Sequence, residues 1–244
     1  MRLGVLDWGI GGLFAARRVL EKAPGTELLY LSDAGNLPYG RQSAPQLRRS
    51  VESALGFLVE QGATELLVAC HAASTVLPGL RLGRPVHGVI DASGLPTARL
   101  TLVIGGQRTI RSGAWRRALA GRAVLQRVAQ PLSAHVEAGR SADSACKADL
   151  DRILAPAHGA TGVVLACTHY AALAEAIAER MPGAWVVDPA MGVVDRLLDG
   201  LPAGVDRPAP RFFTTGAPQA MVEVADKALG MRLSAVEKVV LPTR

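Results

Sequence analysis

Two apolar segments that end in the same way constrain the fold of this chain more than any other feature. Residues 66–70 read Leu-Leu-Val-Ala-Cys, and residues 163–167 read Val-Val-Leu-Ala-Cys. Small or polar residues that can begin a helix follow each run. Because short, continuous apolar runs are typical of strands buried in parallel sheets, the repeat predicts two such strands, each with a cysteine at its carboxyl end.

Strand and helix patterns alternate along the sequence, which predicts an α/β fold with parallel sheets. The pattern begins again after Pro85, and the break at residues 93–96 (Ser-Gly-Leu-Pro) predicts a change of domain. Residues 207–210 (Arg-Pro-Ala-Pro) are typical of a linker. We expect strands at residues 3–6, 27–31, 65–69, 86–90, 100–104, 162–166 and 184–187. We expect helices at residues 13–22, 46–62, 112–120, 142–154 and 191–198, and from residue 219 onward.

The two cysteines at the predicted strand ends should border a ligand site. In open parallel sheets, ligands bind just beyond the carboxyl ends of the strands. A helix that begins after Cys70 or Cys167 would also lower the pKa of that thiol and make it a better base or nucleophile. Cys146 lies inside a predicted helix without such a motif, and we expect it to be a small buried apolar side chain.

The composition predicts a folded protein of the cytoplasm. The chain has 244 residues, of which 49% are hydrophobic, enough for one large domain or two small ones. We find no signal-peptide pattern, and no apolar run approaches the roughly 18 residues of a membrane span. Three cysteines, an odd number, do not form a disulfide framework, so we expect reduced thiols.

The basic charge of the chain raises the question of a nucleic-acid partner. The formal net charge is +6, but only 4% of the residues are aromatic and no nucleic-acid-binding motif is present. A cluster of arginines recurs at helical spacing, for which a solvated helix face is the simpler explanation. We therefore expect neither a nucleic-acid nor a membrane partner. The cluster comprises Arg99, Arg108, Arg111, Arg116, Arg117, Arg122 and Arg127.

Four chemistries use paired cysteines, and their requirements differ. A structural zinc site needs four ligands at short spacings, and a redox pair usually forms a Cys-x-x-Cys motif; neither pattern surrounds Cys70 or Cys167. A nucleophilic cysteine remains open, because His71 and His169 lie close in sequence. Proton transfer on two opposite faces of one carbon fits the repeat best, since one thiolate and one thiol can exchange roles.

The sequence favours a reaction without a metal or cofactor. The segment from Gly9 to Phe14 matches a dinucleotide-binding fingerprint only in part, because Phe14 stands where the last glycine should be. A pyridoxal-phosphate enzyme would need a Schiff-base lysine. The lysines are confined to predicted helical or terminal segments, at Lys22, Lys147, Lys227 and Lys238.

Four motifs, taken in order, resemble glutamate racemase. The resemblance extends over nearly the whole chain. Two of the motifs carry the cysteines of the repeat. The motifs are Leu6-Asp7-x-Gly9-x-Gly11-Gly12, Asp33 with Pro38-Tyr39-Gly40, Ala69-Cys70-x-Ala72-Ala73-Ser74, and Ala166-Cys167-Thr168-His169-Tyr170.

The resemblance implies a fold of two similar α/β domains with mostly parallel sheets flanked by helices. A pseudo-two-fold axis would relate the domains, and the active site would lie between them. The first would comprise residues 1–93 plus 211–244, and the second residues 94–210. The implied activity is cofactor-independent interconversion of L- and D-glutamate, or of a related acidic amino acid, with D-glutamate supplied to peptidoglycan. A homodimer is left open.

The resemblance also implies roles for individual residues. Cys70 would take the α-proton of the D-amino acid and Cys167 that of the L-amino acid, assisted by Asp7 and His169 respectively. Substrate contacts would come from Pro38, Tyr39, Gly40, Thr109 and Thr168, with Asp33 and Glu137 as supporting polar residues.

Three residues on the substrate side depart from the family pattern. Trp8 stands where a serine is typical, and His71 and Ala72 replace asparagine and threonine. If Trp8 pointed into the site, its indole would occupy space, and glutamate would lose the serine hydroxyl as a hydrogen-bond partner. The indole could instead pack against the Pro38 loop. The alternatives are therefore a racemase-derived binding or regulatory protein, or a relative that acts on another substrate, such as aspartate, maleate or a hydantoin.

Overall fold

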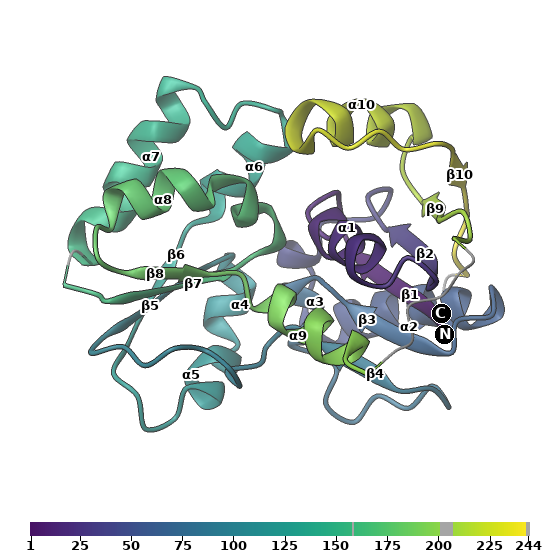
Figure 1. Cartoon of the computed structure of the whole chain (residues 1–244), viewed down its shortest axis with the longest axis horizontal. Coiled ribbons are helices and arrows are strands. Elements are labelled where there is room, and N and C mark those ends of the chain that lie inside the picture. Colours follow the sequence, from purple (N-terminus) through teal and green to yellow (C-terminus); the bar gives the residue numbers. More distant parts are fainter. Residues whose placement is uncertain (158, 201–206, 243–244) are drawn as a thin grey trace.

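The computed structural model describes residues 1–157, 159–200 and 207–242. It contains two sheets, each with helices on both faces, that form two lobes side by side (Figure 1). Every strand pairing in the described residues is parallel. The α/β class predicted from the alternating patterns is confirmed.

The first sheet has six strands in the order β10-β9-β2-β1-β3-β4. The central strands β1, β2 and β3 are apolar and buried because helices cover both faces of the sheet. The strands are β1 (Arg2–Asp7), β2 (Glu27–Ser32), β3 (Glu65–Val68), β4 (Val86–Gly88), β9 (Arg211–Thr214) and β10 (Val236–Lys238).

The second sheet has four strands in the order β6-β5-β7-β8. The strands are β5 (Thr101–Gly105), β6 (Val124–Val128), β7 (Gly162–Ala166) and β8 (Trp185–Val187). The sequence patterns did not predict β6. It is a half-exposed edge strand in which Gln126 and Arg127 interrupt the apolar run, so it lacks the signal of a buried strand.

The predicted helices are present, with the one expected at residues 112–120 shortened to 114–118, whereas the helices at residues 107–111, 130–137 and 174–180 were not predicted. Ser43 and Gln46 form a reciprocal capping box at the start of α2, which fixes where that helix begins. The helices of the first lobe are α1 (Leu13–Lys22), α2 (Ala44–Glu60), α3 (His71–Ser74), α9 (Pro189–Leu198) and α10 (Pro218–Leu229), with the 3₁₀ turn η1 (Tyr39–Arg41). Those of the second are α4 (Gln107–Arg111), α5 (Ala114–Ala118), α6 (Gln130–Glu137), α7 (Ser144–Leu154) and α8 (Ala174–Arg180), with the 3₁₀ turns η2 (Ala155–Ala157) and η3 (Thr168–Leu173).

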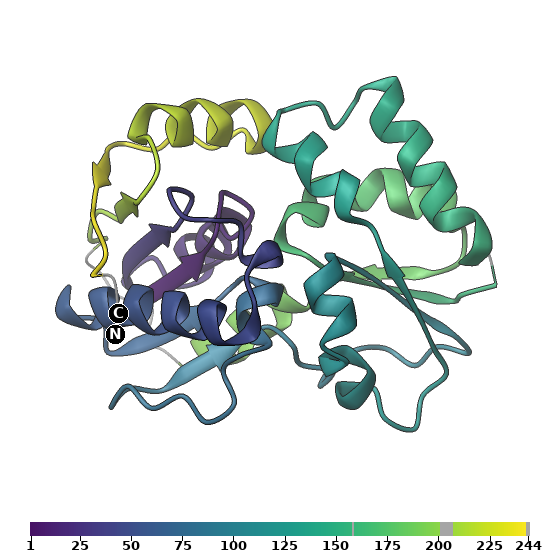
Figure 2. The same cartoon turned by 180° about the vertical axis from the view of Figure 1, so that it is seen from behind.

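Each sheet separates two hydrophobic clusters. In the first lobe, α1, α9 and α10 pack on one face of the sheet and α2 on the other. Figure 2 shows α2, in blue, on the side of the sheet away from α1. In the second lobe, α6, α7 and α8 cover one face, and Trp115 of α5 is buried on the other. The cores are therefore large enough to hold the strand ends in fixed positions.

The two sheets share a topology that explains the repeat in the sequence. The order β2-β1-β3-β4 of the first lobe matches β6-β5-β7-β8 of the second. Cys70 lies just beyond β3, and Cys167 just beyond β7, so the two thiols occupy equivalent strand ends. β9 and β10 extend the first sheet alone.

The helix α9 packs on the first lobe, although in the sequence it follows β8, a strand of the second lobe. Val193 and Val194 lie in the same cluster as Leu13 and Ala16 of α1. Arg18 also pairs with Asp195 at 2.9 Å. The predicted division into residues 1–93 plus 211–244 and 94–210 puts α9 in the second lobe, unlike its packing, and that division stays a prediction.

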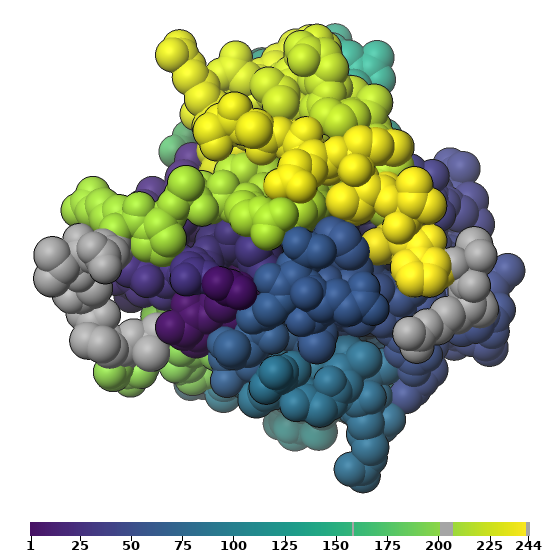
Figure 3. All heavy atoms as spheres, turned by 90° about the vertical axis from the view of Figure 1, so that its right-hand side faces the viewer, coloured from purple at the N-terminus to yellow at the C-terminus, as the bar shows by residue number. Residues whose placement is uncertain are grey.

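The C-terminal segment lies against the first lobe. Figure 3 shows it in yellow, crossing the blue surface of that lobe. The Ser53 hydroxyl of α2 donates a hydrogen bond to the carbonyl of Pro242 at 2.8 Å. Among the residues described, no helix combines the length and apolar character needed to cross a membrane.

Candidate active site

The two strand-end thiols lie in different surroundings. Cys70 is 9% exposed and caps the short helix α3, whereas Cys167 is partly exposed and precedes η3. Burial raises the pKa of Cys70 well above its usual value, and the charges of Asp7 and Cys167 add to this.

The prediction that a helix N-terminus would lower the pKa of these thiols is wrong for Cys70. Hydrogen bonds from the backbone amides of Ala73 and Ala72 do act in the predicted direction. Loss of solvation outweighs them, because α3 is only four residues long and the thiol is buried. Cys70 is therefore held as the neutral thiol.

Cys167 belongs to a chain of three polar side chains. Its Sγ lies 3.6 Å from Nδ1 of His169, and Nε2 of the same ring is hydrogen-bonded to Oε1 of Glu137. Burial opposes a charge on the ring, but the bonds to Cys167 and Glu137 outweigh it and raise the pKa of His169 well above its usual value. A charged imidazole therefore lies beside Sγ of Cys167.

Glu137 comes to this site from α6, far from His169 in sequence. Burial would raise the pKa of its carboxyl, but the hydrogen bond and the charge of His169 lower it below its usual value. The structure thus brings together Cys167, His169 and Glu137, which the sequence analysis had named separately. Glu137 remains charged and orients the imidazole.

Asp7 lies at the end of β1 and is 1% exposed. Its Oδ2 accepts hydrogen bonds from the Gly12 amide at 2.7 Å and from the Thr168 hydroxyl of the other lobe at 3.2 Å. Its Oδ1 has no partner among the described residues. Burial raises the pKa of Asp7, and the charge of His169 opposes the increase. The Thr168 hydroxyl, predicted to hold substrate, bonds to Asp7 here.

The glycines after β1 bring the two lobes into contact. A Cβ atom on Gly9 would lie 2.2 Å from Oε1 of Glu137, and one on Gly11 would lie 2.5 Å from Oγ1 of Thr168. These distances are too short for any side chain to fit without movement. The turn therefore requires glycine in order to pack closely against the second lobe.

Asp33 organises the loop that carries Pro38, Tyr39 and Gly40. Its carboxylate accepts hydrogen bonds from the Tyr39 hydroxyl at 2.8 Å, from Nδ2 of Asn36 at 2.7 Å and from the Thr215 hydroxyl at 2.8 Å. Tyr39 is 1% exposed, so its ring is part of the core of the first lobe. Pro38 and Gly40 lie on the more exposed side of the loop.

Trp8 bonds to the same loop. Its indole Nε1 donates a hydrogen bond to the carbonyl of Asn36 at 3.0 Å, and its ring packs at the edge of the first-lobe core. Of the two orientations considered for Trp8, the structure has the one in which it packs against the loop. The Trp8 side chain therefore connects the end of β1 to this loop.

His71 is buried between the lobes without a hydrogen bond. It is 1% exposed, and neither ring nitrogen has a partner among the described residues. The ring stacks on Trp115 of α5, with 6.0 Å between the ring centroids. Burial lowers the pKa of His71 to about 3, so the ring is neutral. Ala72 beside it is partly buried and offers no side-chain hydrogen bond.

Arg108 is a residue that the sequence analysis assigned to a solvated helix face, and that assignment is wrong. It is half-buried in α4, next to the buried Thr109, and its Nη1 donates a hydrogen bond to the carbonyl of Gln42 in the other lobe at 3.0 Å. Helical spacing alone does not distinguish a face toward solvent from one toward another lobe. No signal in the sequence identified it.

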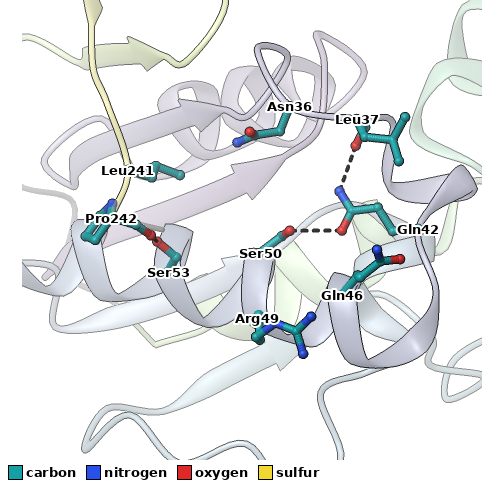
Figure 4. A pocket seen from close by; sticks show the side chains of 9 residues that line it. All are labelled: Asn36, Leu37, Gln42, Gln46, Arg49, Ser50, Ser53, Leu241 and Pro242. Carbon is teal, nitrogen blue, oxygen red and sulfur yellow. Dashed lines mark hydrogen bonds between the residues drawn. The ribbon is translucent and has the colours of Figure 1, made fainter. Parts of the chain in front are cut away.

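Two surface hollows lie away from the thiols. One, of about 300 Å³, is lined by residues of the loop after β2, of α2 and of the C-terminal segment, including Asn36, Gln42 and Leu241 (Figure 4). In it, Gln42 donates to the Leu37 carbonyl at 2.7 Å and accepts from the Ser50 hydroxyl at 2.9 Å. The other, of about 510 Å³, lies between β4 and α9.

Comparisons with known proteins agree with the fold. The family model described as Asp/Glu/Hydantoin racemase matches residues 15–197. The chain is 31% identical to the glutamate racemase of Desulforudis audaxviator, over 98% of this chain and 97% of that protein.

Solved structures agree equally well. The chain aligns with the glutamate racemase of Thermus thermophilus bound to β-chloro-D-alanine, at 30% identity and a TM-score of 0.86, over 98% of this chain and 96% of that one. A glutamate racemase of Bacillus anthracis aligns at 28% identity and a TM-score of 0.90, over 99% and 98% of the two chains.

Proposed function

Since this chain belongs to the Asp/Glu/hydantoin racemase family and is an amino-acid racemase, we propose that it interconverts L- and D-glutamate, or a related acidic amino acid, by two-base proton transfer. Cys70 and Cys167 would act on opposite faces of Cα, without a cofactor. The single observation that supports this most is the pair of thiols at equivalent strand ends, with Asp7 beside one and His169 beside the other.

The surroundings of the two thiols suggest which one is the base in the resting protein. Burial favours the neutral thiol at Cys70, so we assign Cys167, which lies next to the charged His169, as the base. For an L-amino acid, the Cys167 thiolate would take the α-proton and the electron pair of the broken C–H bond would remain on the substrate. The Cys70 thiol would then deliver its proton to the opposite face of Cα.

The same groups would serve the reverse reaction. After one turnover, Cys70 is the thiolate and Cys167 the thiol, so a D-amino acid would be deprotonated by Cys70. The pair has to exchange protons with solvent or with a new substrate before the next L-to-D turnover. We propose that Asp7 and His169 assist this exchange, because each lies beside one thiol.

Hydrogen exchange at Cα tests the proposal. Incubation of L-glutamate with the protein in D2O should give α-deuterated D-glutamate, followed by NMR and by chiral analysis. A related acidic amino acid may replace glutamate in the same assay, and no exchange with any amino acid of a panel would overturn the proposal.

Single-cysteine variants test the assignment of faces. In Cys70→Ala, Cys167 can still exchange the α-proton of L-glutamate, but no D-glutamate should form. Cys167→Ala should show the mirror result with D-glutamate. Cys146→Ala is the matched control, because Cys146 lies in the core of the second lobe, and full activity is expected. Racemisation by Cys70→Ala at the wild-type rate would remove that thiol from the mechanism.

The substrate could also be another acid of the family. Two observations favour this second candidate. His71 is neutral and forms no hydrogen bond among the described residues, and the Thr168 hydroxyl is bonded to Asp7, so two side chains predicted to bind glutamate are not available to it. Thermal-shift measurements across a panel of acidic ligands distinguish it, and also a binding protein without activity, since only a turnover substrate exchanges its α-proton.

The biological role proposed for the product is the supply of D-glutamate for peptidoglycan in the cytoplasm, on the resemblance alone. Rescue of a bacterial strain that requires D-glutamate, compared with Cys70→Ala, tests this role. Failure of the wild-type gene to rescue, together with activity on another acid in vitro, would contradict it. A homodimer stays a prediction that sedimentation can check.

A further inference from the structure

Arg108 carries a positive charge to the contact between the lobes. Its α4 helix contacts both α3, which follows Cys70, and η1, which contains Tyr39 and Gly40. The hydrogen bond from Nη1 to the Gln42 carbonyl fixes the guanidinium beside the end of η1. The side chain therefore lies where the loop of the first lobe meets the second lobe.

The guanidinium lacks an acidic partner. Among the described residues, its one hydrogen bond is the bond from Nη1, and no carboxylate forms an ion pair with it. Its Nε is fully buried and has no acceptor. Burial lowers the pKa of Arg108, and no nearby carboxylate opposes that effect. A half-buried cation with a buried, unused N–H is costly unless a ligand supplies an anion.

One nitrogen of this guanidinium is available to a ligand. Nη1 is bonded to Gln42 and Nε is buried, so Nη2, which is neither bonded nor fully buried, is left to donate a charge-assisted hydrogen bond to a carboxylate. The acid must come from outside the described residues.

The Gln130 side chain lies between α4 and the loop that carries Gly40. Oε1 of Gln130 accepts a hydrogen bond from the Gln107 amide at 3.1 Å, and a Cβ on Gly40 would lie 4.0 Å from that oxygen. The loop of the first lobe is thus held near α4. A substrate carboxylate placed against this loop would lie within the reach of a long side chain such as arginine.

We propose that Arg108 determines the specificity of the site by binding the side-chain carboxylate of an acidic amino-acid substrate through Nη2. This inference rests on the proposed racemase function and narrows its substrate to amino acids with an anionic side chain. It gives the site a cation that Trp8, His71 and Ala72 do not provide. Arg108 is a substrate-binding residue in this account, with no part in the proton transfer.

The test compares glutamate with its uncharged isostere glutamine. In Arg108→Gln, KM for glutamate should rise about 10- to 100-fold, while KM for glutamine and kcat for both change little. Arg108→Lys should recover part of the affinity for glutamate, because it keeps the charge but places the donor on a shorter, differently shaped side chain. Arg116→Gln is the matched control: Arg116 is exposed on α5 and should leave both substrates unaffected.

A purely structural role of Arg108 gives a different result. If Arg108 only joined the lobes through Gln42, its replacement would raise KM for glutamate and for glutamine by the same factor. That result would overturn the inference. Circular dichroism of Arg108→Gln shows whether the variant is folded, and Arg108→Lys provides the comparison if it is not.

A binding measurement keeps this inference separate from the racemase proposal. Should the wild-type protein exchange no α-proton, the racemase proposal fails, and calorimetric titration with D-glutamate and D-glutamine then tests Arg108 alone. Preference for glutamate in the wild type, lost in Arg108→Gln, would support the inference. Equal affinity of the wild type for both, or binding of neither, would overturn it.

Discussion

Two histidines that follow the two thiols differ completely in their charge. His71 comes directly after Cys70 and has a pKa of about 3, whereas the pKa of His169, two residues after Cys167, lies well above its usual value. Both rings are buried, so burial alone does not explain the difference. His169 has Glu137 and Cys167 as partners, while His71 has none among the described residues. Local partners therefore decide the charge beside each thiol.

Glu137→Gln should lower the stability of the protein in a pH-dependent way. A raised pKa means that the charged His169 contributes fully below its unfolded pKa of about 6.5, and that this contribution is lost as pH rises through the folded pKa. We expect a loss of about 1–3 kcal/mol in the free energy of unfolding at pH 6, shrinking at alkaline pH. Urea unfolding at several pH values measures it.

The control for this prediction is an exposed ion pair. Glu52→Gln removes the partner of Arg48 on the surface of α2 and should change stability by no more than about 0.5 kcal/mol. An equal cost of Glu137→Gln at pH 6 and at alkaline pH would show that the charge of His169 is not involved.

His71→Asn should make the protein less sensitive to acid. The folded pKa of His71 is about 3, so between the unfolded pKa and that value the unfolded state binds more protons and stability falls as pH falls. The wild type should lose about 1.4 kcal/mol per pH unit from this group between about pH 6 and pH 4. The difference in unfolding free energy between the two proteins measures the slope, and a difference independent of pH would contradict the prediction.

At the scale of elements, the turn between β1 and α1 packs closely against the second lobe. Gly9 and Gly11 leave no space for a side chain beside Glu137 and Thr168. A glycine pattern that partly matches a dinucleotide fingerprint thus has a packing role here. The same residue type in a helix, Gly56 of α2, has open space around its Cα.

Gly11→Ala should reduce activity far more than stability. The added Cβ would meet Oγ1 of Thr168 at 2.5 Å and the backbone nitrogen of His169 at 2.8 Å, so the lobe carrying Cys167 has to move. A displacement of about 1 Å at the reacting groups costs about 100-fold in rate. The rate of α-deuterium exchange and the melting temperature, measured on the same variant, check this.

The matched substitution for Gly11→Ala is Gly56→Ala. A Cβ at Gly56 meets nothing within 4 Å, so this change should leave the exchange rate unaltered and stabilise α2 by about 0.5–1 kcal/mol. Wild-type activity in Gly11→Ala would show that the lobes do not need this close contact.

At the scale of the whole molecule, two lobes lie side by side, and four strands of the first sheet have the same order as the four strands of the second. The equivalent thiols follow the carboxyl ends of β3 and β7. The chain crosses between the lobes after β4 and again after β8. Arg196 of α9 joins the two crossings, because it bonds to Asp91 and, at 3.5 Å, to the carbonyl of Ser93. The helix α9 therefore ties the two connections between the lobes together.

Hydrogen exchange of the native protein should assign α9 to the first lobe. Its buried residues share a core with α1, and Asp195 pairs with Arg18 and Lys22 of that helix. We expect the amides of α9 to exchange with the same opening free energy as those of α1. Exchange of α9 together with β7 and β8 would support the boundary at residue 210 instead, and mass spectrometry of the peptides distinguishes the two.

The sequence by itself determined the fold class and the repeat that carries both thiols. Periodicity and the Ala-Cys strand ends suffice for these, because burial of apolar strands is a local pattern. The sequence also predicted a role for Glu137, but only through the resemblance to glutamate racemase.

Only the tertiary structure decided which side chains carry charge and where they lie. The raised pKa of Cys70, the contact between Glu137 and His169, the orientation of Trp8 and the half-buried position of Arg108 each depend on residues distant in sequence. Loss of solvation and the approach of a charged partner arise only when the lobes are packed together, so no pattern within one segment contains them.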